Sequence, residues 1–195
     1  MNEKINSADL RVQKTRKALF DTLLSLLNRK RFDAITVNEL CDQALVRRAT
    51  FYQHFADKYD FFSAFVHHIS ESFYHQLPLD FTTDTPQKTY AQLFSQFLSF
   101  LEENEKLIYN CMDSNAFPLL LDIIAEEINQ RTLQIIRDSR SQTPATNPPA
   151  EILASFLTGG LVQIAKDWIH TPDWAKDDVI RDVHVLLDSI PFAPE

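Results

Sequence analysis

Glycine is the residue that this chain of 195 residues most conspicuously lacks. It has only two, whereas average usage of about 7% would give roughly fourteen. Tight hairpins between strands consume glycine, while helix interiors avoid it. The scarcity therefore indicates a protein built almost wholly of helices. Because the two glycines are adjacent, at Gly159 and Gly160, a glycine-rich phosphate-binding loop is excluded.

Long apolar runs and clustered cysteines are missing as well. No apolar run reaches the roughly 18 residues of a membrane helix, and the polar start MNEKINSADLRVQK does not resemble a signal peptide. Cys41 and Cys111 stand alone, so neither a disulfide framework nor a CxxC pair is present. Nucleophile motifs and paired catalytic carboxylates are also lacking. We therefore expect a cytoplasmic protein that is not an enzyme and has no cofactor, metal site or membrane contact.

The charge of the chain is unevenly distributed. The formal net charge is −8, but residues 1–60 carry a net charge of +3 and residues 61–195 a net charge of −11. A positive N-terminal region on an acidic remainder indicates an anionic partner at the N-terminal region only.

Apolar residues at helical spacing divide the chain into about nine helices. Thr36-Val37-Asn38-Glu39 is typical of a capping box, with Thr36 as N-cap of the second helix. Residues 139–149, SRSQTPATNPP, are expected to form a linker. The predicted helices cover about residues 9–28, 37–43, 47–54, 57–77, 86–101, 105–112, 115–137, 150–169 and 173–189.

The second and third predicted helices are short and are separated by a break at residues 44–46. Together with the long helix before them they form a helix-turn-helix pattern. The second helix of such a unit enters the major groove of DNA, where its N-terminal residues meet base edges. This pattern predicts DNA binding.

Polar and aromatic side chains share the segment LVRRATFYQHF, residues 45–55. Arg47 and Arg48 lie at the N-terminus of the predicted helix, and the planar guanidinium of arginine matches a guanine edge or a phosphate. Phe51 and Phe55 are four residues apart, so they share the inner face and leave the polar residues outside. Hydroxyl, amide and imidazole groups that can bond phosphates or bases come from Thr50, Tyr52, Gln53 and His54.

Residues 15–62 resemble the TetR family of bacterial regulators. The resemblance rests on Thr15-Arg16 and on the stretch ITVNELCDQALVRRATFYQHFADKYDFF, with its T-V-x-E-L start, its A-T-F-Y-x-H-F helix and the following D-K pair. It implies an all-α, homodimeric regulator that binds a palindromic operator in double-stranded DNA. The DNA-binding domain would be residues 1–56, and residues 57–195 would bind an effector and form the dimer.

The resemblance also assigns roles to single residues. Thr50 and Tyr52 would contact phosphates or bases, and Lys58 would bind a phosphate. Thr36 would cap the second helix and could touch the DNA backbone. The residues that would read the sequence are Arg47, Arg48, Gln53 and His54.

Two positions depart from the family pattern. Leu45 stands at the turn, where relatives usually have glycine, and Ala49 stands before Thr50, where they often have glycine. A leucine in the left-handed conformation costs roughly 1–2 kcal/mol. We therefore expect this turn to close with a different geometry.

The C-terminal helices predict a dimer interface. Glycine inside a helix costs roughly 1 kcal/mol relative to alanine, so placing both glycines in one helix indicates that another helix approaches closely there. The predicted interface has two helices from each subunit and includes Phe156, Gly159, Gly160, Ile164, Val183 and Leu187.

Aromatic side chains of the middle helices predict a cavity for a largely apolar or aromatic effector. Its candidate lining residues are Tyr90, Phe94, Phe97, Tyr109, Met112 and Trp168. The segment FLTGGLVQIAKDWI, residues 156–169, resembles a subset of the family that includes the dihydroxyacetone kinase regulators.

We expect a repressor whose affinity for its operator changes when the effector binds. Three alternatives remain open. The protein could be an activator switched by a protein partner, as the resemblance of residues 156–169 suggests. It could also be an all-helical enzyme, which the missing catalytic motifs disfavour, or a helical protein-interaction module.

Overall fold

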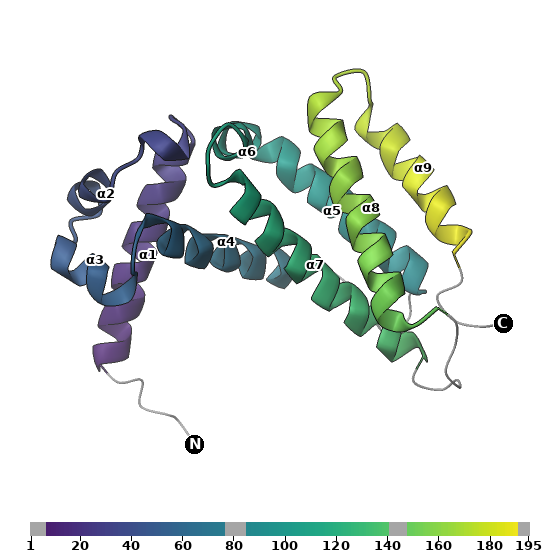
Figure 1. Cartoon of the computed structure of the whole chain (residues 1–195), viewed down its shortest axis with the longest axis horizontal. Coiled ribbons are helices and arrows are strands. Elements are labelled where there is room, and N and C mark those ends of the chain that lie inside the picture. Colours follow the sequence, from purple (N-terminus) through teal and green to yellow (C-terminus); the bar gives the residue numbers. More distant parts are fainter. Residues whose placement is uncertain (1–6, 77–84, 141–147, 191–195) are drawn as a thin grey trace. The chain divides into compact units, whose positions relative to one another are not determined.

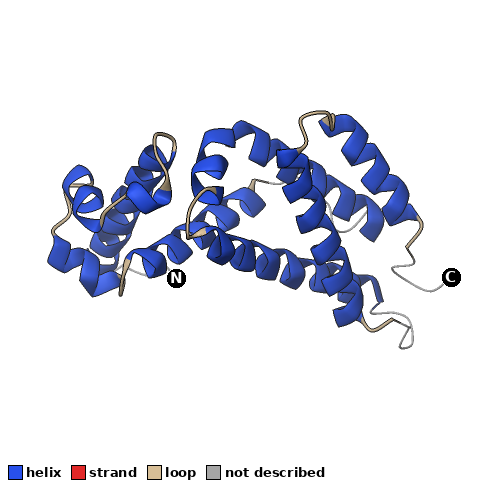
Figure 2. Ribbon diagram, turned by 45° about the horizontal axis from the view of Figure 1, so that its top comes forward, coloured by secondary structure: helices blue, strands red, loops and turns tan. Residues whose placement is uncertain are grey.

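The computed structural model describes residues 7–76, 85–140 and 148–190 (Figure 1). Within these ranges every regular element is helical and no strand is present (Figure 2). The prediction of an all-α fold is therefore confirmed.

Nine α-helices and one short 3₁₀ turn, η1, make up the described part of the chain. Their bounds are α1 Ser7–Leu27, η1 Phe32–Ala34, α2 Val37–Gln43, α3 Arg48–His54, α4 Lys58–His75, α5 Pro86–Glu103, α6 Glu105–Met112, α7 Phe117–Arg140, α8 Ala150–His170 and α9 Lys176–Asp188. The predicted helices agree with these bounds to within a few residues, and only η1 was not predicted. Part of the predicted linker is helical, because α7 continues to Arg140; residues 141–147 lie outside the described ranges.

The chain packs into two compact units. The first unit comprises residues 1–69 and 104–121, and the second comprises residues 70–103 and 122–195. Packing thus places α6 and the first part of α4 with the helix-turn-helix. The division of function between residues 56 and 57 remains a prediction.

Aromatic rings form the core of the first unit around α3. The Phe61 ring of α4 lies 5.4 Å from the Phe51 ring and 4.9 Å from the Phe55 ring, measured between centroids. Phe20 of α1 stacks on Phe61 at 5.6 Å. Phe51 and Phe55 are buried, so the prediction that they form the inner face of the recognition helix is confirmed. Four leucines of α1 are buried as well: Leu19, Leu23, Leu26 and Leu27.

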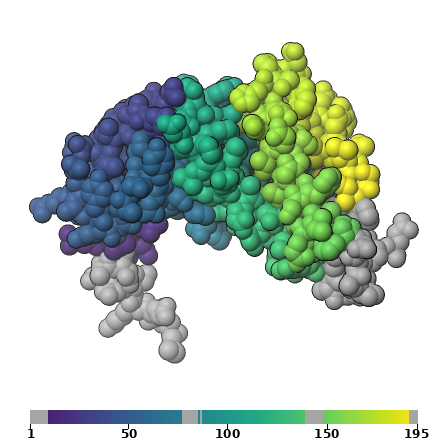
Figure 3. Space-filling view, in the orientation of Figure 1, coloured from purple at the N-terminus to yellow at the C-terminus, as the bar shows by residue number. Residues whose placement is uncertain are grey.

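In the second unit, α9 packs against α5. Val179, Val183 and Leu187 recur every four residues on α9 and are all buried, which gives this helix one apolar face towards its own chain. Lys176, at the start of α9, forms an ion pair with Glu102 at the end of α5. Figure 3 shows α8 and α9 exposed along one surface of this unit.

The turn between α2 and α3 retains the left-handed geometry, so the expectation of a different turn is wrong. Leu45 has a φ of 55°. Its N–H donates to the Asp42 carbonyl at 3.4 Å, and the Val46 N–H donates to the Cys41 carbonyl at 2.9 Å. These two bonds form a Schellman motif, which satisfies the last carbonyls of α2. They offset the strain of a leucine in a position that favours glycine.

Replacing Leu45 with glycine should stabilise the protein. The Leu45 side chain is 94% exposed, so its loss removes almost no burial. The change relieves a left-handed penalty of about 1–2 kcal/mol and costs about 0.5–1 kcal/mol of backbone entropy. We expect the free energy of unfolding in urea to rise by about 0.5–1 kcal/mol. The control Leu45→Ala keeps the Cβ atom, so its free energy of unfolding should match that of the wild type. A glycine variant less stable than the wild type would show that Leu45 is not strained.

Candidate nucleic-acid interface

The recognition helix α3 presents a polar outer face because its inner face is fixed by Phe51. Of the eight residues predicted to contact DNA, five are exposed: Thr36, Arg47, Arg48, Tyr52 and Gln53. Thr50, His54 and Lys58 are half-buried. All eight belong to the first compact unit.

Arg48 and Tyr52 form a pair on this outer face. They are four residues apart, and the Arg48 guanidinium carbon lies 5.8 Å from the centroid of the Tyr52 ring. The Tyr52 side chain is 49% exposed, and its ring meets the buried Phe51 ring edge-on at 5.4 Å. A cation over an aromatic face is attracted by the ring quadrupole. The contact holds the guanidinium beside the helix while its donors remain open to a phosphate or base edge.

The N-terminus of α3 is capped by backbone rather than by a side chain. Arg47 is the N-cap residue, and its carbonyl accepts the N–H groups of Thr50 at 2.8 Å and Phe51 at 3.1 Å. The backbone of Arg47 is extended, and its side chain makes no cap hydrogen bond. The Arg47 guanidinium has only donors and so cannot cap these N–H groups. It takes no part in ending the helix.

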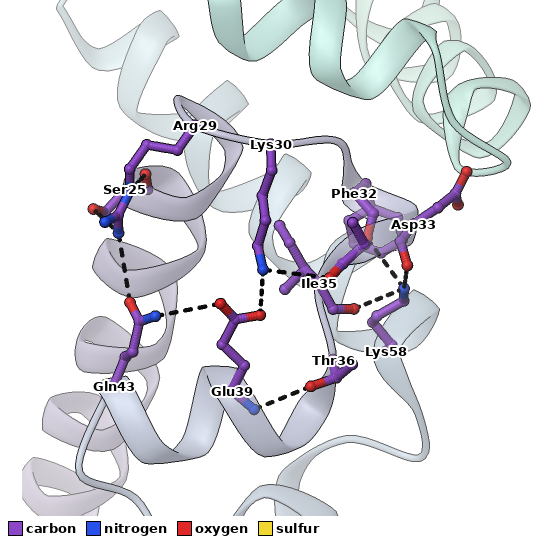
Figure 4. A network of polar contacts seen from close by, with 11 residues as sticks. Ser25, Arg29, Lys30, Phe32, Asp33, Ile35, Thr36, Glu39, Gln43 and Lys58 are labelled. Atoms are coloured by element: carbon purple, nitrogen blue, oxygen red, sulfur yellow. Dashed lines mark hydrogen bonds and ion pairs between the residues drawn. The ribbon is translucent and has the colours of Figure 1, made fainter.

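The predicted capping box of α2 is half formed (Figure 4). Thr36 accepts the Glu39 N–H at 3.2 Å, as an N-cap should. The Glu39 carboxylate, which would turn back to the N-cap in a full box, accepts a hydrogen bond from Lys30 at 2.5 Å and one from Gln43 at 3.4 Å. Glu39 thus connects α2 with the end of α1.

The basic cluster at residues 29–31 is engaged within the first unit. Arg29 donates to Ser25 and Gln43, and Lys30 pairs with Glu39. Arg31 pairs with Asp113 at 3.0 Å. All three basic side chains of this cluster therefore have partners inside the first unit.

Lys58 does not point into solvent. Its ammonium donates hydrogen bonds to the carbonyls of Phe32 at 3.1 Å, Asp33 at 3.5 Å and Ile35 at 3.0 Å (Figure 4). Burial lowers the pKa of the Lys58 ammonium, against a weaker opposite effect of the nearby Asp33 carboxylate. The predicted phosphate ligand is thus occupied by backbone oxygens in this structure.

Several polar contacts that no sequence pattern predicts join distant segments of the first unit. The Asn110 amide donates to the Leu27 carbonyl at 2.7 Å. The Asn115 N–H donates to both carboxylate oxygens of Asp33 at 3.2 Å. The partners are more than eighty residues apart in the sequence, so no local pattern could have linked them.

Two family models match the chain. One is described as "Bacterial regulatory proteins, tetR family" and matches residues 19–65, which contain the helix-turn-helix. The other, described as "Transcriptional regulator C-terminal region", belongs to the same family and matches residues 88–179. The chain belongs to the TetR family. It is therefore a DNA-binding transcriptional regulator of a family that does not consist of enzymes.

Solved structures of TetR-family regulators share this fold at low sequence identity. A TetR-family transcriptional regulator from Pectobacterium atrosepticum has a TM-score of 0.65 and 18% identity, over 92% of this chain and 93% of that chain. The fatty acid degradation regulator FadR from Bacillus halodurans has a TM-score of 0.65 and 13% identity, over 90% and 95%. Reduced NemR from E. coli has a TM-score of 0.63 and 15% identity, over 90% and 97%.

These similarities show the fold of a TetR regulator and nothing about its effector. No curated protein matches the sequence. The resemblance of residues 156–169 to the dihydroxyacetone kinase regulators is not tested by the family matches and stays a prediction.

The residues predicted to line the effector cavity fall into both compact units. Tyr109 and Met112 lie on α6 in the first unit, and Tyr109 is 44% exposed. The second unit contains Tyr90, Phe94, Phe97 and Trp168. The six residues therefore do not come together within one unit, because α6 packs against α1.

The residues predicted to form the dimer interface differ in exposure. Phe156 is 69% exposed, and Gly159 and Gly160 are also exposed. Val183 and Leu187 are only 4% and 3% exposed, because the face of α9 that carries them packs on α5. Those two side chains offer a partner almost no surface, which corrects the predicted interface.

Both cysteines are buried free thiols. Burial raises the pKa of Cys41, and it raises the pKa of Cys111 to about 12. The thiolate is the reactive form of cysteine, so neither side chain is suited to sensing oxidants at neutral pH.

Two further absences concern residues 7–76, 85–140 and 148–190. None of the helices there combines the length and the apolar character needed to cross a membrane. In the same ranges, His, Cys, Asp and Glu side chains form no group of three that could hold a metal ion.

Proposed function

We propose that this TetR-family regulator is a homodimeric repressor that reads a palindromic operator through α3 and releases it when an effector binds. The observation that carries the proposal is the outer face of α3, where Arg48 and Tyr52 stand exposed on a helix fixed from behind by Phe51. The net charge of +3 over residues 1–60 supports binding of an anionic polymer at this unit.

Repression is the simplest mechanism for such a regulator, because a bound dimer blocks access to the DNA that it covers. An activator switched by a protein partner is the alternative. A reporter gene placed behind the operator separates the two, since deletion of the regulator raises expression under repression and lowers it under activation.

DNA binding is tested by selecting a duplex from a random pool and measuring affinity at several salt concentrations. The affinity of the wild type should fall steeply with salt, with a slope of about −0.9 for each neutralised phosphate. Arg48→Ala should weaken binding by about 1–3 kcal/mol and relax one base preference. Tyr52→Phe keeps the ring over which Arg48 lies and removes only the hydroxyl, so it should weaken all sequences alike.

Two outcomes would contradict this reading of α3. One is wild-type binding that is independent of salt. The other is an Arg48→Ala variant that selects the same sequence with the same affinity as the wild type. Lys17→Ala serves as a matched control, because Lys17 is exposed on α1 and pairs with Asp21.

The dimer is supported by glycines that the subunit itself does not require. A Cβ atom built on Gly159 or Gly160 meets no atom within 4 Å. Packing inside the chain therefore does not explain two glycines that each cost a helix roughly 1 kcal/mol. Large apolar side chains are exposed on the same two helices: Ile152, Phe156, Val185 and Leu186.

We propose that α8 and α9 of two subunits form a four-helix interface around Gly159 and Gly160. Val185 and Leu186, which are 65% and 56% exposed, take the place of Val183 and Leu187 in it. Obligate homodimers bury on the order of 2,000 Å² or more, and a palindromic operator requires their two-fold axis.

Gly160→Leu should convert the dimer into a monomer and abolish operator binding. The added side chain has room within its own subunit, so the helical circular dichroism signal should stay close to that of the wild type. Light scattering measures the mass. Lys17→Leu introduces the same side chain on α1 and should remain dimeric. An unchanged dimer for Gly160→Leu, or a wild-type monomer at micromolar concentration, would refute the interface.

A buried polar cluster in the second unit supports an uncharged effector. The Tyr90 and Thr132 hydroxyls are hydrogen-bonded at 3.0 Å, and Thr132 also donates to the Ile128 carbonyl at 2.8 Å. Burial raises the pKa of the Tyr90 phenol to about 12, against weaker opposite effects of the Thr132 and Thr158 hydroxyls. The Thr158 Oγ1 atom lies beside the Tyr90 hydroxyl but not in good hydrogen-bond geometry with it, so this buried hydroxyl is poorly satisfied.

We propose that the effector is largely apolar and completes this cluster with one neutral hydrogen-bonding group. The free protein would then carry a poorly satisfied Thr158 hydroxyl; a buried hydroxyl with no partner at all costs about 1–3 kcal/mol. Thr158→Val should therefore raise the melting temperature of the free protein by a few degrees and leave operator binding intact. Thr158→Ser is the matched control and should not raise it. A destabilised Thr158→Val variant would show that the hydroxyl is already satisfied.

A further inference from the structure

Lys58 is a cation at the N-terminus of a helix, where the helix dipole disfavours positive charge. It is the first residue of α4. Instead of extending into solvent, its ammonium turns back to the carbonyls of Phe32, Asp33 and Ile35 (Figure 4). Its nitrogen also lies 4.4 Å from the centroid of the Phe32 ring.

The carbonyls that Lys58 binds belong to a segment with little regular hydrogen bonding of its own. Phe32 and Ile35 are fully buried, whereas Asp33 and Ala34 between them are exposed. Buried carbonyls require partners. Lys58 supplies three N–H donors, and Lys30 donates to the remaining carbonyl, that of Ala34, at 3.3 Å. Two lysines thus donate to all four carbonyls of residues 32–35, and the Phe32 carbonyl also accepts the Ile35 N–H at 3.0 Å.

This segment determines where the helix-turn-helix begins. Ile35 directly precedes Thr36, which caps α2 through the Glu39 N–H. On the other side, the Asp33 carboxylate accepts the Asn115 N–H. The turn at residues 32–35 therefore has contacts at both its ends. The Schellman turn at Leu45 then connects α2 to α3.

We propose that Lys58 is a positioning residue that holds the turn at residues 32–35 and so sets the geometry of the helix-turn-helix, rather than a ligand of a DNA phosphate. A phosphate contact would require the ammonium to leave three carbonyls, two of them on residues whose side chains are fully buried. The second arm of the following test rests on the proposed DNA binding, whereas the first arm does not.

The first arm measures thermal unfolding without DNA. Lys58→Met keeps the length of the side chain but donates nothing, and Lys58→Arg replaces a compact donor by a planar guanidinium that fits three converging carbonyls poorly. Both variants should melt about 5 °C or more below the wild type. The exposed control Lys17→Met should melt with the wild type. Wild-type melting temperatures for both Lys58 variants would overturn the proposal.

The second arm measures affinity for the selected duplex as a function of salt. A positioning role predicts that both Lys58 variants bind about ten-fold more weakly or worse, with the salt slope unchanged. A phosphate ligand predicts a slope shallower by about 2 for the dimeric Lys58→Met protein, with affinity retained in Lys58→Arg; this result would overturn the proposal. A wild type that binds no duplex would refute the proposed function instead, and the first arm would then decide the role of Lys58.

Discussion

The contact of Phe51 and Phe55 with Phe61 is the constraint on which the DNA-binding surface depends. The recognition helix Arg48–His54 has seven residues, far fewer than an isolated helix needs for stability in water. Its geometry must therefore come from its inner face. Two rings at the end of this helix lie against the Phe61 ring of α4, and Phe20 of α1 stacks on that ring from another helix. The outer residues acquire fixed directions only because these rings are buried.

Hydrogen bonds to the turn that leads into α2 are a second constraint on the first unit. Regular helices satisfy their own backbone, whereas in residues 32–35 the carbonyls of Asp33, Ala34 and Ile35 accept hydrogen bonds from lysine side chains. Lys30, Glu39 and Gln43 continue the same polar chain from the end of α1 to α2. Much of the positive charge of the N-terminal region thus serves the structure of the unit. Arg47 and Arg48 at the start of α3 are exposed, as are Arg11 and Lys14 on α1.

Two features of the second unit, one exposed and one buried, differ in what they require of a binding partner. An exposed apolar surface on α8 and α9 is complete in itself and needs only a partner of matching shape. The cluster around Tyr90, Thr132 and Thr158 contains the poorly satisfied Thr158 hydroxyl, and a poorly satisfied buried hydroxyl is a free-energy cost. In a regulator such a cost is useful, because a ligand that satisfies the hydroxyl binds the conformation in which it can do so more tightly than the other conformation.

The sequence by itself determined the fold class, the position of the helix-turn-helix and the inner face of α3. These follow from glycine scarcity, helical periodicity and the spacing of Phe51 and Phe55, all of which are local properties. The structure alone decided which face of α9 is buried. The stripe of Val179, Val183 and Leu187 looked equally suited to a partner subunit until α5 was found to cover it.

Tertiary structure also decided the role of Lys58 and the conformation of Leu45. The sequence does not show whether a lysine after a recognition helix faces DNA or the carbonyls of a turn 23 to 26 residues before it. The sequence predicts that a left-handed Leu45 is strained, but it does not predict that the chain adopts this conformation. The hydrogen bonds to Asp42 and Cys41 that offset the strain form only in the folded chain. Periodicity fixes local elements, whereas long-range hydrogen bonds depend on which elements meet.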